Sequence, residues 1–115
     1  MPVEVISPDP RSRWRAVPTG IERSEDGGRT WIPVRPAGGE IITGGMSPAR
    51  NVVWLAGRAG LVLVTVDGFT FARVDLPERI DVASITASDG RSATVTTTDG
   101  RTFRTDDSGR TWRRN

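Results

Sequence analysis

Three aspartates, Asp26, Asp67 and Asp107, are the first candidates for chemistry in this chain of 115 residues. Each lies in a short motif that reads Ser/Thr-x-Asp, a glycine-containing turn, then Thr and an aromatic residue: SEDGGRTW, TVDGFTF and TDDSGRTW. An aspartate at the start of a tight turn accepts hydrogen bonds from backbone N–H groups, and glycine takes the positive φ that closes the loop. The motif therefore predicts residues that hold turns.

The three copies supply fifteen candidate residues. The threonine of each copy is expected to begin a return strand, and the aromatic ring to be buried between neighbouring sheets, where a ring removes roughly 150–250 Å² from water. Replacement of Asp26 by alanine is expected to cost stability and to affect no reaction. The residues are Ser24, Asp26, Gly28, Thr30 and Trp31; Thr65, Asp67, Gly68, Thr70 and Phe71; and Thr105, Asp107, Gly109, Thr111 and Trp112.

The chain lacks most of the side chains used in catalysis and metal binding, because it has no His, Cys or Tyr. Their absence excludes an imidazole base, a thiolate or tyrosyl nucleophile, a disulfide and a Cys/His metal site. Asp106 and Asp107 are adjacent and directly follow the expected strand 102–105, where successive side chains point to opposite faces, so they make a poor paired-carboxylate site. The turns also lack the spaced oxygen ligands and closing Glu of an EF-hand. We expect no enzyme, no cofactor and no metal.

Three further residues could contact a ligand or a partner. Arg58 lies in a turn, where an arginine can bind a carboxylate or a phosphate, although a solvated turn residue is the simpler interpretation. Trp14 and Trp54 could stack on sugar rings if they were exposed. Their separation of about forty residues instead favours the same buried strand position in two repeats.

The charges favour neither nucleic acid nor membrane as a partner. All sixteen basic residues are arginines, and they interleave with fourteen carboxylates to a formal charge of +2. A basic stripe is therefore lacking. No apolar run approaches the ~20 residues of a membrane span. The lysine-free composition suits a GC-rich bacterium, and the lack of Cys fits either redox compartment.

The elements that position these residues are β-strands. Apolar residues alternate with period two, turns are marked by Asp-Gly and Gly-Gly, and no stretch keeps helical spacing for three turns. The sequence therefore predicts an all-β fold. The expected strands are 14–17, 21–24, 31–35, 40–43, 52–56, 61–65, 70–74, 82–87, 93–97, 102–105 and 111–114, with 3–6 as one further possibility.

The motif recurs every forty residues or so, which with four strands per repeat is the size of a β-propeller blade. We therefore expect a single domain, 1–115, of about three units at 1–35, 36–75 and 76–115. The first unit is expected to be incomplete, because only 3–6 could open it and prolines surround that segment.

The motif resembles the Asp-box, or BNR repeat, of propeller hairpins. The stretch VVWLAGRAGLVLVTVDGFTFARV (52–74) is similar to the repeat of the Ycf48/Hcf136-like photosystem II assembly factors. ATVTTTDGRTFRTDDSGRTW (93–112) and WLAGRAGLVLVTVDG (54–68) also resemble C-terminal domains of bacterial anti-sigma-factor-like proteins. The resemblance implies a non-enzymatic propeller that binds partner polypeptides, and the anti-sigma subgroup implies an extracytoplasmic domain of a longer protein.

Three blades are too few for a closed ring of four to eight. An open row is expected to expose an apolar face at each end, which a second copy could cover by forming a six-bladed ring with two-fold symmetry. A piece cut from a longer propeller would show the same sequence. The preferred hypothesis is a homo-oligomeric module that binds a protein or peptide, as the sensory or interaction domain of an anti-sigma or assembly-factor-like protein. The alternative is a carbohydrate-binding, lectin-like oligomeric propeller.

Overall fold

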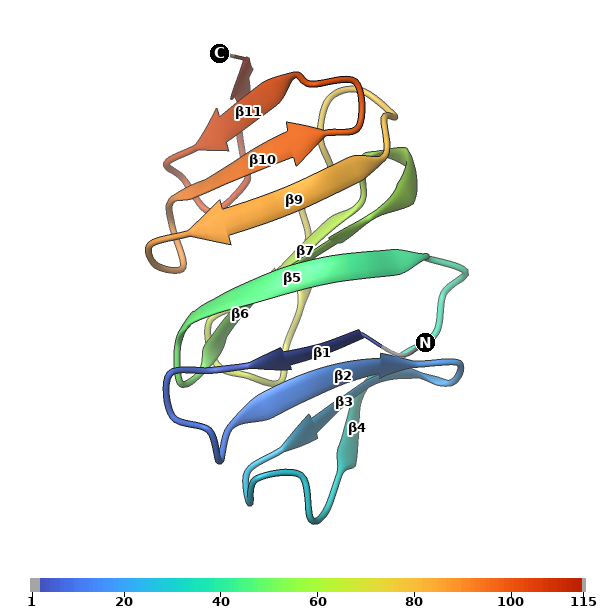
Figure 1. Ribbon diagram of the computed structural model, residues 1–115, viewed down its shortest axis with the longest axis vertical. Helices are drawn as coiled ribbons and strands as arrows, with labels where there is room; N and C mark the ends of the chain where they lie inside the picture. Colours follow the sequence, from blue (N-terminus) through green and yellow to red (C-terminus); the bar gives the residue numbers. More distant parts are fainter. Residues whose placement is uncertain (1–2, 115) are drawn as a thin grey trace.

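The computed structural model describes residues 3–114 and contains three four-stranded antiparallel sheets stacked in a row (Figure 1). The strands of each sheet follow one another in chain order, so the chain completes one sheet before it begins the next. The prediction of an all-β fold built from four-stranded antiparallel blades is confirmed. Residues 1, 2 and 115, which fall in the predicted first and third units, lie outside the described part.

The row begins with sheet 1, drawn blue in Figure 1, and ends with sheet 3, drawn orange to red. Sheet 1 contains β1 (Val3–Ile6), β2 (Arg13–Val17), β3 (Gly20–Ser24) and β4 (Ile32–Pro36). Sheet 2 contains β5 (Ile42–Ala49), β6 (Val52–Gly57), β7 (Val62–Thr65) and β8 (Ala72–Arg73), with the 3-10 turn η1 (Arg58–Gly60) between β6 and β7. Sheet 3 contains β9 (Val82–Ala87), β10 (Ala93–Thr97), β11 (Thr102–Thr105) and β12 (Arg113–Arg114).

Sheet 1 is a complete blade, so the prediction that the first unit is incomplete is wrong. All of β1 pairs with β2, from Val3 opposite Ala16 to Ile6 opposite Arg13. Pro8 lies beyond the end of the strand, in a turn that the hydrogen bond from Ser7 N to Ser12 O closes at 3.1 Å. Because no ladder hydrogen bond is needed from this turn, its prolines do not interrupt the sheet.

β5 is twice as long as the predicted strand 40–43 and begins two residues later. Its pairing with β6 shifts between Ile42 and Gly44 and again between Met46 and Ala49, which marks two irregularities in the ladder. Glycines and a proline are typical of such positions, although they read as strand breakers in a sequence. A Cβ at Gly45 would lie 2.6 Å from the Trp54 carbonyl oxygen, so this glycine permits the close approach of β5 to β6.

Sheet 2 is buried on both faces, which explains its continuous apolar runs VVWLAG and VLVT. One face, with Val53, Leu55 and Leu63, joins Trp14 and Ile21 of sheet 1 in a buried cluster. The other face packs against sheet 3 through apolar residues that include Trp54, Ala56, Val62 and Val64. The core of the molecule is therefore divided into two layers, one in each gap between sheets.

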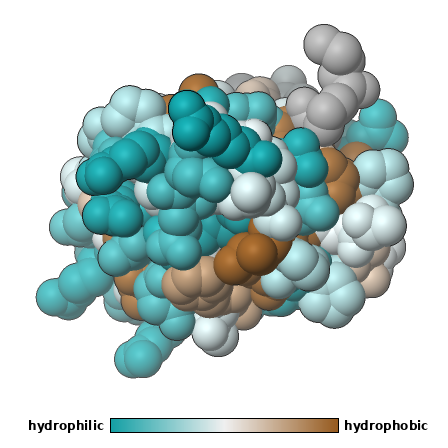
Figure 2. All heavy atoms as spheres, turned by 90° about the horizontal axis from the view of Figure 1, so that it is seen from below, coloured by the Kyte–Doolittle hydropathy of each residue, from teal (hydrophilic) through white to brown (hydrophobic). Residues whose placement is uncertain are grey.

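The outer face of sheet 1 is mainly charged, and Ile6 of β1 is 50% exposed among the charged residues. Arg15 pairs with Glu22 across β2 and β3 at the register position where Leu55 pairs with Leu63 in sheet 2. The two charged side chains form an ion pair of 2.7 Å. Figure 2 views the molecule from the end at which sheet 1 lies and shows mainly hydrophilic side chains, with smaller apolar patches among them.

The outer face of sheet 3 is also polar. Thr94 pairs with Arg104 at the register position where Trp54 pairs with Val64 in sheet 2, and Thr86 completes this row on β9. The prediction that both ends of the row expose apolar faces is therefore wrong. Within residues 3–114, no helix is long and apolar enough to cross a bilayer.

Candidate functional site

The Asp-box turns are closed by their aspartates. The Asp26 carboxylate Oδ1 accepts hydrogen bonds from the backbone N–H groups of Arg29 at 3.0 Å and Thr30 at 2.9 Å. The Ser24 hydroxyl donates to Oδ1 at 2.8 Å, and the Thr30 hydroxyl donates to Oδ2 at 2.5 Å. Both oxygens of Asp26 are thus engaged within the turn itself.

The third copy repeats this arrangement, while the shorter second copy varies it. Asp107 accepts from the Thr111 N–H at 2.9 Å and from its hydroxyl at 2.6 Å. Asp67 accepts from the N–H groups of Phe69 at 2.9 Å and Thr70 at 2.8 Å, each one residue closer along the chain because this loop is one residue shorter. The hydrogen bonds support a turn-holding role for all three aspartates.

These hydrogen bonds also fix the ionisation of the carboxyl groups. Hydrogen bonds from the Thr30 hydroxyl and N–H hold the pKa of Asp26 far below its usual range, and those from the Thr70 and Phe69 N–H groups do the same for Asp67. The Thr111 hydroxyl is the main cause that lowers the pKa of Asp107 to about 2. Groups so firmly ionised are unsuited to donating a proton near neutral pH.

The hydroxyl residue of each box is buried and accepts a hydrogen bond from the glycine of the same turn. The Gly28 N–H donates to the Ser24 hydroxyl at 2.8 Å, the Gly68 N–H to the Thr65 hydroxyl at 3.1 Å, and the Gly109 N–H to the Thr105 hydroxyl at 2.9 Å. The glycines adopt φ values of 94°, 85° and 84°, a backbone region that favours glycine.

The aromatic residues of the second and third boxes pack onto the preceding sheet. Trp112 lies edge-on to Trp54 of sheet 2, with ring centroids 6.3 Å apart, and its Nε1–H donates to the Val74 carbonyl at 2.8 Å. Phe71 is half-buried against the cluster between sheets 1 and 2. Trp31 has no preceding sheet within the described residues, and the Arg15 guanidinium covers its ring at 4.1 Å. The expected burial of Trp31 between sheets is therefore corrected.

Trp14 and Trp54 do occupy one strand position in two repeats, and both are fully buried. Trp14 donates its Nε1–H to the Gly68 carbonyl at 3.0 Å, and Trp54 donates to the Asp89 carbonyl at 2.9 Å. Each ring thus ties its sheet to the next one along the row. Because neither ring reaches the surface, the prediction that they could contact a ligand is corrected.

Arg58 is exposed at η1, and its guanidinium makes no hydrogen bond or ion pair within residues 3–114. The neighbouring Ala59 has φ 59°, and its N–H donates to the Asp81 carboxylate at 2.9 Å. The turn is thereby held to the chain that leads into sheet 3, and Arg58 is left as a surface cation.

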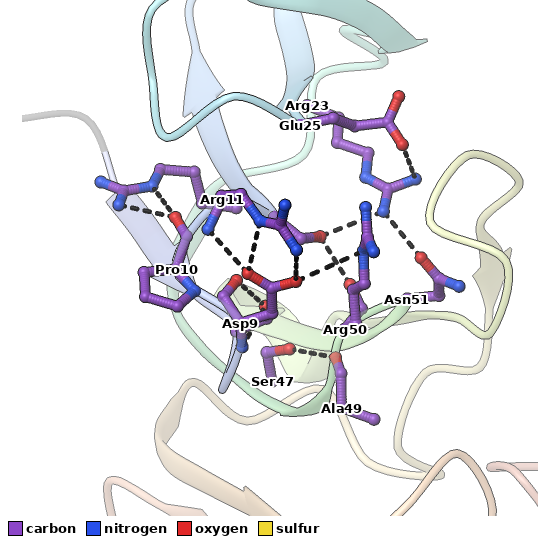
Figure 3. Close-up of polar contacts among 12 residues, drawn as sticks. Asp9, Pro10, Arg11, Arg23, Glu25, Ser47, Ala49, Arg50 and Asn51 are labelled. Carbon is purple, nitrogen blue, oxygen red and sulfur yellow. Dashed lines mark hydrogen bonds and ion pairs between the residues drawn. The ribbon is translucent and has the colours of Figure 1, made fainter.

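Arg23, which no sequence motif singled out, is a fully buried arginine that joins sheets 1 and 2 (Figure 3). Its Nη2 donates to the Ser12 hydroxyl at 3.0 Å and to Asn51 Oδ1 at 2.8 Å. Its guanidinium lies 4.6 Å from the Phe69 ring centroid and 5.3 Å from that of Trp14. Burial lowers the pKa of this guanidinium, but its ordinary value is so high that it stays charged.

The charged residues beside Arg23 hold the β1–β2 turn. Asp9 accepts from the N–H and Nε of Arg11, both at 3.2 Å, and lies 3.7 Å from Arg50 Nε (Figure 3). The Arg11 side-chain hydrogen bond is the main cause that lowers the pKa of Asp9. Asp9 thus pairs with two arginines, Arg11 and Arg50, and joins them to the turn.

A groove of about 450 Å³ opens between sheet 1 and the chain that connects it to sheet 2. Its polar side chains are Arg35 and Glu40, which form an ion pair of 3.2 Å. Ile41 is 52% exposed at its wall. The other apolar walls come from the end of β2, the β2–β3 turn, β3 and the end of β4, and include Val17, Pro18, Ile21 and Pro36. The sequence did not reveal this groove, because its residues come from separate elements with no shared motif.

The corresponding gap between sheets 2 and 3 differs in size and in chemistry. It holds about 220 Å³ and is lined by small and aliphatic residues such as Gly44, Ala56 and Val82, with no charged side chain. The groove beside Arg35 is therefore not a general consequence of stacking sheets. Its size lies in the range of ligand pockets, roughly 300–1,000 Å³, and we take it as the candidate functional site.

Comparison with known proteins gives a family model and similar solved structures. The model of the photosynthesis system II assembly factor YCF48 matches residues 17–115. A structure of YCF48 bound to D1 peptide superposes with a TM-score of 0.79 at 25% identity, over 97% of this chain and 39% of that one. YCF48 from Cyanidioschyzon merolae gives 0.77 at 23% identity, over 97% of this chain and 35% of that one. No match was found among curated proteins.

Proposed function

The chain belongs to the photosystem II assembly factor YCF48 family, and from this premise we propose that it is a non-catalytic module that binds a peptide segment of a partner protein. The chain spans about two-fifths of the peptide-bound YCF48 structure and somewhat less of the other. Peptide binding is thus carried over to it as a proposal. A protein that holds a partner polypeptide requires a binding surface and no reacting group.

The observation that carries the proposal is the groove beside Arg35. It combines apolar walls with a charged pair, the composition expected of a site that buries aliphatic side chains and orients a polar backbone. The Asp-box aspartates support the non-catalytic part, because their oxygens are occupied by turn hydrogen bonds.

Selection of peptides from a random displayed library tests the proposal. We expect immobilised full-length chain to enrich a family of peptides that compete with one another and bind saturably in solution, as measured by fluorescence anisotropy. A D1 peptide, the ligand of the similar structure, serves as one defined probe. Enrichment no higher than that on an unrelated all-β protein would contradict peptide binding.

Carbohydrate binding is the weaker candidate. It depended on exposed aromatic rings, and the burial of Trp14 and Trp54 argues against it. A glycan array is the discriminating measurement, since saturable binding of a sugar would reverse the preference.

We further propose that units 1–35, 36–75 and 76–115 work as one repeat domain. We also propose Arg58 as an additional contact to the partner.

The same binding role suits the interaction domain of an assembly-factor-like or an anti-sigma-like protein. A reading frame that encodes a zinc finger and a membrane helix upstream of this domain would support the anti-sigma context. Ring closure by a second copy is the weaker proposal for the state in solution, because both end faces carry polar pairs, and the mass in solution tests it.

A further inference from the structure

We propose that the groove beside Arg35 receives an uncharged aliphatic peptide segment, whose main-chain carbonyl accepts a hydrogen bond from the Arg35 guanidinium. This inference rests on the proposed peptide-binding function and names the ligand chemistry of its site. The competing ligand would be an acidic segment or a C-terminal carboxylate, which an arginine ordinarily attracts.

The charge around Arg35 is already neutralised. Glu40 lies 3.2 Å from Arg35 and 3.5 Å from Arg73, and Arg73 is also paired with Asp75 at 2.8 Å. Two arginines and two carboxylates therefore form one neutral network, in which Arg35 and Glu40 line the groove. A carboxylate ligand would gain the attraction of Arg35 but would also meet the repulsion of Glu40, whose side chain is only 11% exposed and held in place. A neutral acceptor meets no such repulsion.

Most N–H donors of the Arg35 guanidinium nevertheless make no hydrogen bond within the described residues. A guanidinium carries five N–H donors, and the only hydrogen bond from this one within the described residues runs from Nη2 to Glu40. Nε is buried and has no acceptor there, so the group has lost hydration without replacing it. The side chain is 24% exposed, so a ligand carbonyl can reach the donors that remain.

The walls select for aliphatic side chains. Pro18 and Pro36 carry no backbone N–H, so the wall offers few donors to compete with Arg35 for a ligand carbonyl. Ile41 is half exposed at the rim of the groove, and a ligand that covered it would remove apolar surface from water. Neutral charge, one under-used donor group and apolar walls together fit an extended aliphatic segment.

Two synthetic peptides of about eight residues, some 26–29 Å when extended, test the inference. The first is an Ala/Val/Pro sequence with acetylated and amidated ends. The second replaces two of its residues by Glu and leaves the C-terminus free. We expect fluorescence anisotropy with the full chain to show tighter binding of the neutral peptide, and equal or tighter binding of the acidic one would overturn the inference.

Variants then locate the site. We expect Arg35→Gln to weaken binding of the neutral peptide about two- to tenfold, the factor for one hydrogen bond. Ile41→Asp is expected to weaken it by more than about tenfold, because it replaces apolar wall by charge. The matched control is Val66→Asp, which changes another exposed aliphatic residue, 63% exposed and outside the groove, and is expected to leave binding unchanged.

The outcomes separate the two proposals. If the peptides bind but Arg35→Gln and Ile41→Asp, shown to be folded by thermal melting, bind like the parent chain, the groove assignment fails and peptide binding stands. If neither these peptides nor any library peptide binds, the proposed function fails and takes the inference with it.

Discussion

Asp106 and Asp107 are adjacent carboxylates with different roles: Asp107 closes a turn, and Asp106 forms ion pairs at the surface. Asp107 closes a turn through the Thr111 N–H and hydroxyl and receives a hydrogen bond from Thr105. Asp106 forms surface contacts with Arg104 and Arg113, and such exposed pairs contribute little to stability. The comparison of the two isolates the contribution of the turn.

We therefore expect Asp107→Ala to lower the Tm by several degrees and Asp106→Ala to change it only slightly. The first substitution leaves turn N–H and hydroxyl donors without their acceptor, while the second removes contacts that water replaces. Circular dichroism melts of both variants measure the difference. Equal Tm values would show that the box aspartate does not hold its turn.

The same hydrogen bonds predict how stability depends on pH. Asp107 has a folded pKa of about 2 against an ordinary value of 3.8, and the pKa values of Asp26 and Asp67 are also lowered. A carboxyl whose pKa is lowered by folding adds stability above its unfolded pKa, and this stability is lost as pH falls towards the folded value. We expect a constant Tm from about pH 7 to 5 and a steep fall between about pH 4 and 2.

Asp107→Asn provides the control for the acid transition. An amide does not titrate, so the variant should show a shallower fall of Tm over the same pH range than the parent chain. An identical slope in the two proteins would mean that the box carboxylates do not cause the acid loss.

Among the elements, the Asp-box turn of sheet 2 also contacts sheet 1, because the Arg23 side chain lies against its glycine, Gly68. A Cβ at Gly68 would collide with the Arg23 guanidinium, which fills the gap between this turn and sheet 1. Gly39 has nearly the same φ, 84° against 85°, but a Cβ there meets nothing within 4 Å. The pair separates backbone strain from contact between sheets.

Gly68→Ala is accordingly expected to destabilise the protein more than Gly39→Ala. Both variants lose about 1 kcal/mol of folding free energy, because alanine is less stable than glycine in a left-handed backbone conformation. Gly68→Ala must also displace a buried cation from the rings of Trp14 and Phe69. Urea unfolding with tryptophan fluorescence measures both losses, and similar midpoints would show that Arg23 moves aside without cost.

Strands that have a regular local sequence pattern could be predicted from the sequence. Features that depend on contacts between elements could not. The bounds of β9, β10 and β11 were predicted, because alternation and a flanking turn define a regular strand locally. β5 was misplaced because its irregular ladder is set by contact with β6, which Gly45 permits and no local pattern reveals. The groove and Arg23 depend on neighbouring sheets, so only the assembled fold could show them.

In the whole molecule, the two end faces of the row differ in chemistry from its inner faces. The inner faces carry the leucines and tryptophans that stack sheets, while the outer faces carry Arg15 with Glu22 at one end and Thr94 with Arg104 at the other. A polar face gains little free energy when a second copy covers it. We therefore expect the chain in solution to have the monomer mass of 12.5 kDa.

The double variant Arg15→Leu/Glu22→Leu restores on sheet 1 the leucine pair that sheet 2 presents at Leu55 and Leu63. We expect it to self-associate as concentration rises, because apolar area on an exposed face gains about 25 cal/mol per Å² when it is covered. Light scattering after size-exclusion chromatography measures the mass. The matched control, Arg101→Leu/Glu78→Leu, removes a 2.6 Å ion pair away from the end faces and should stay monomeric. If the parent chain is already dimeric, or if the end-face variant stays monomeric at every concentration, the charged pair is not what keeps the row from stacking.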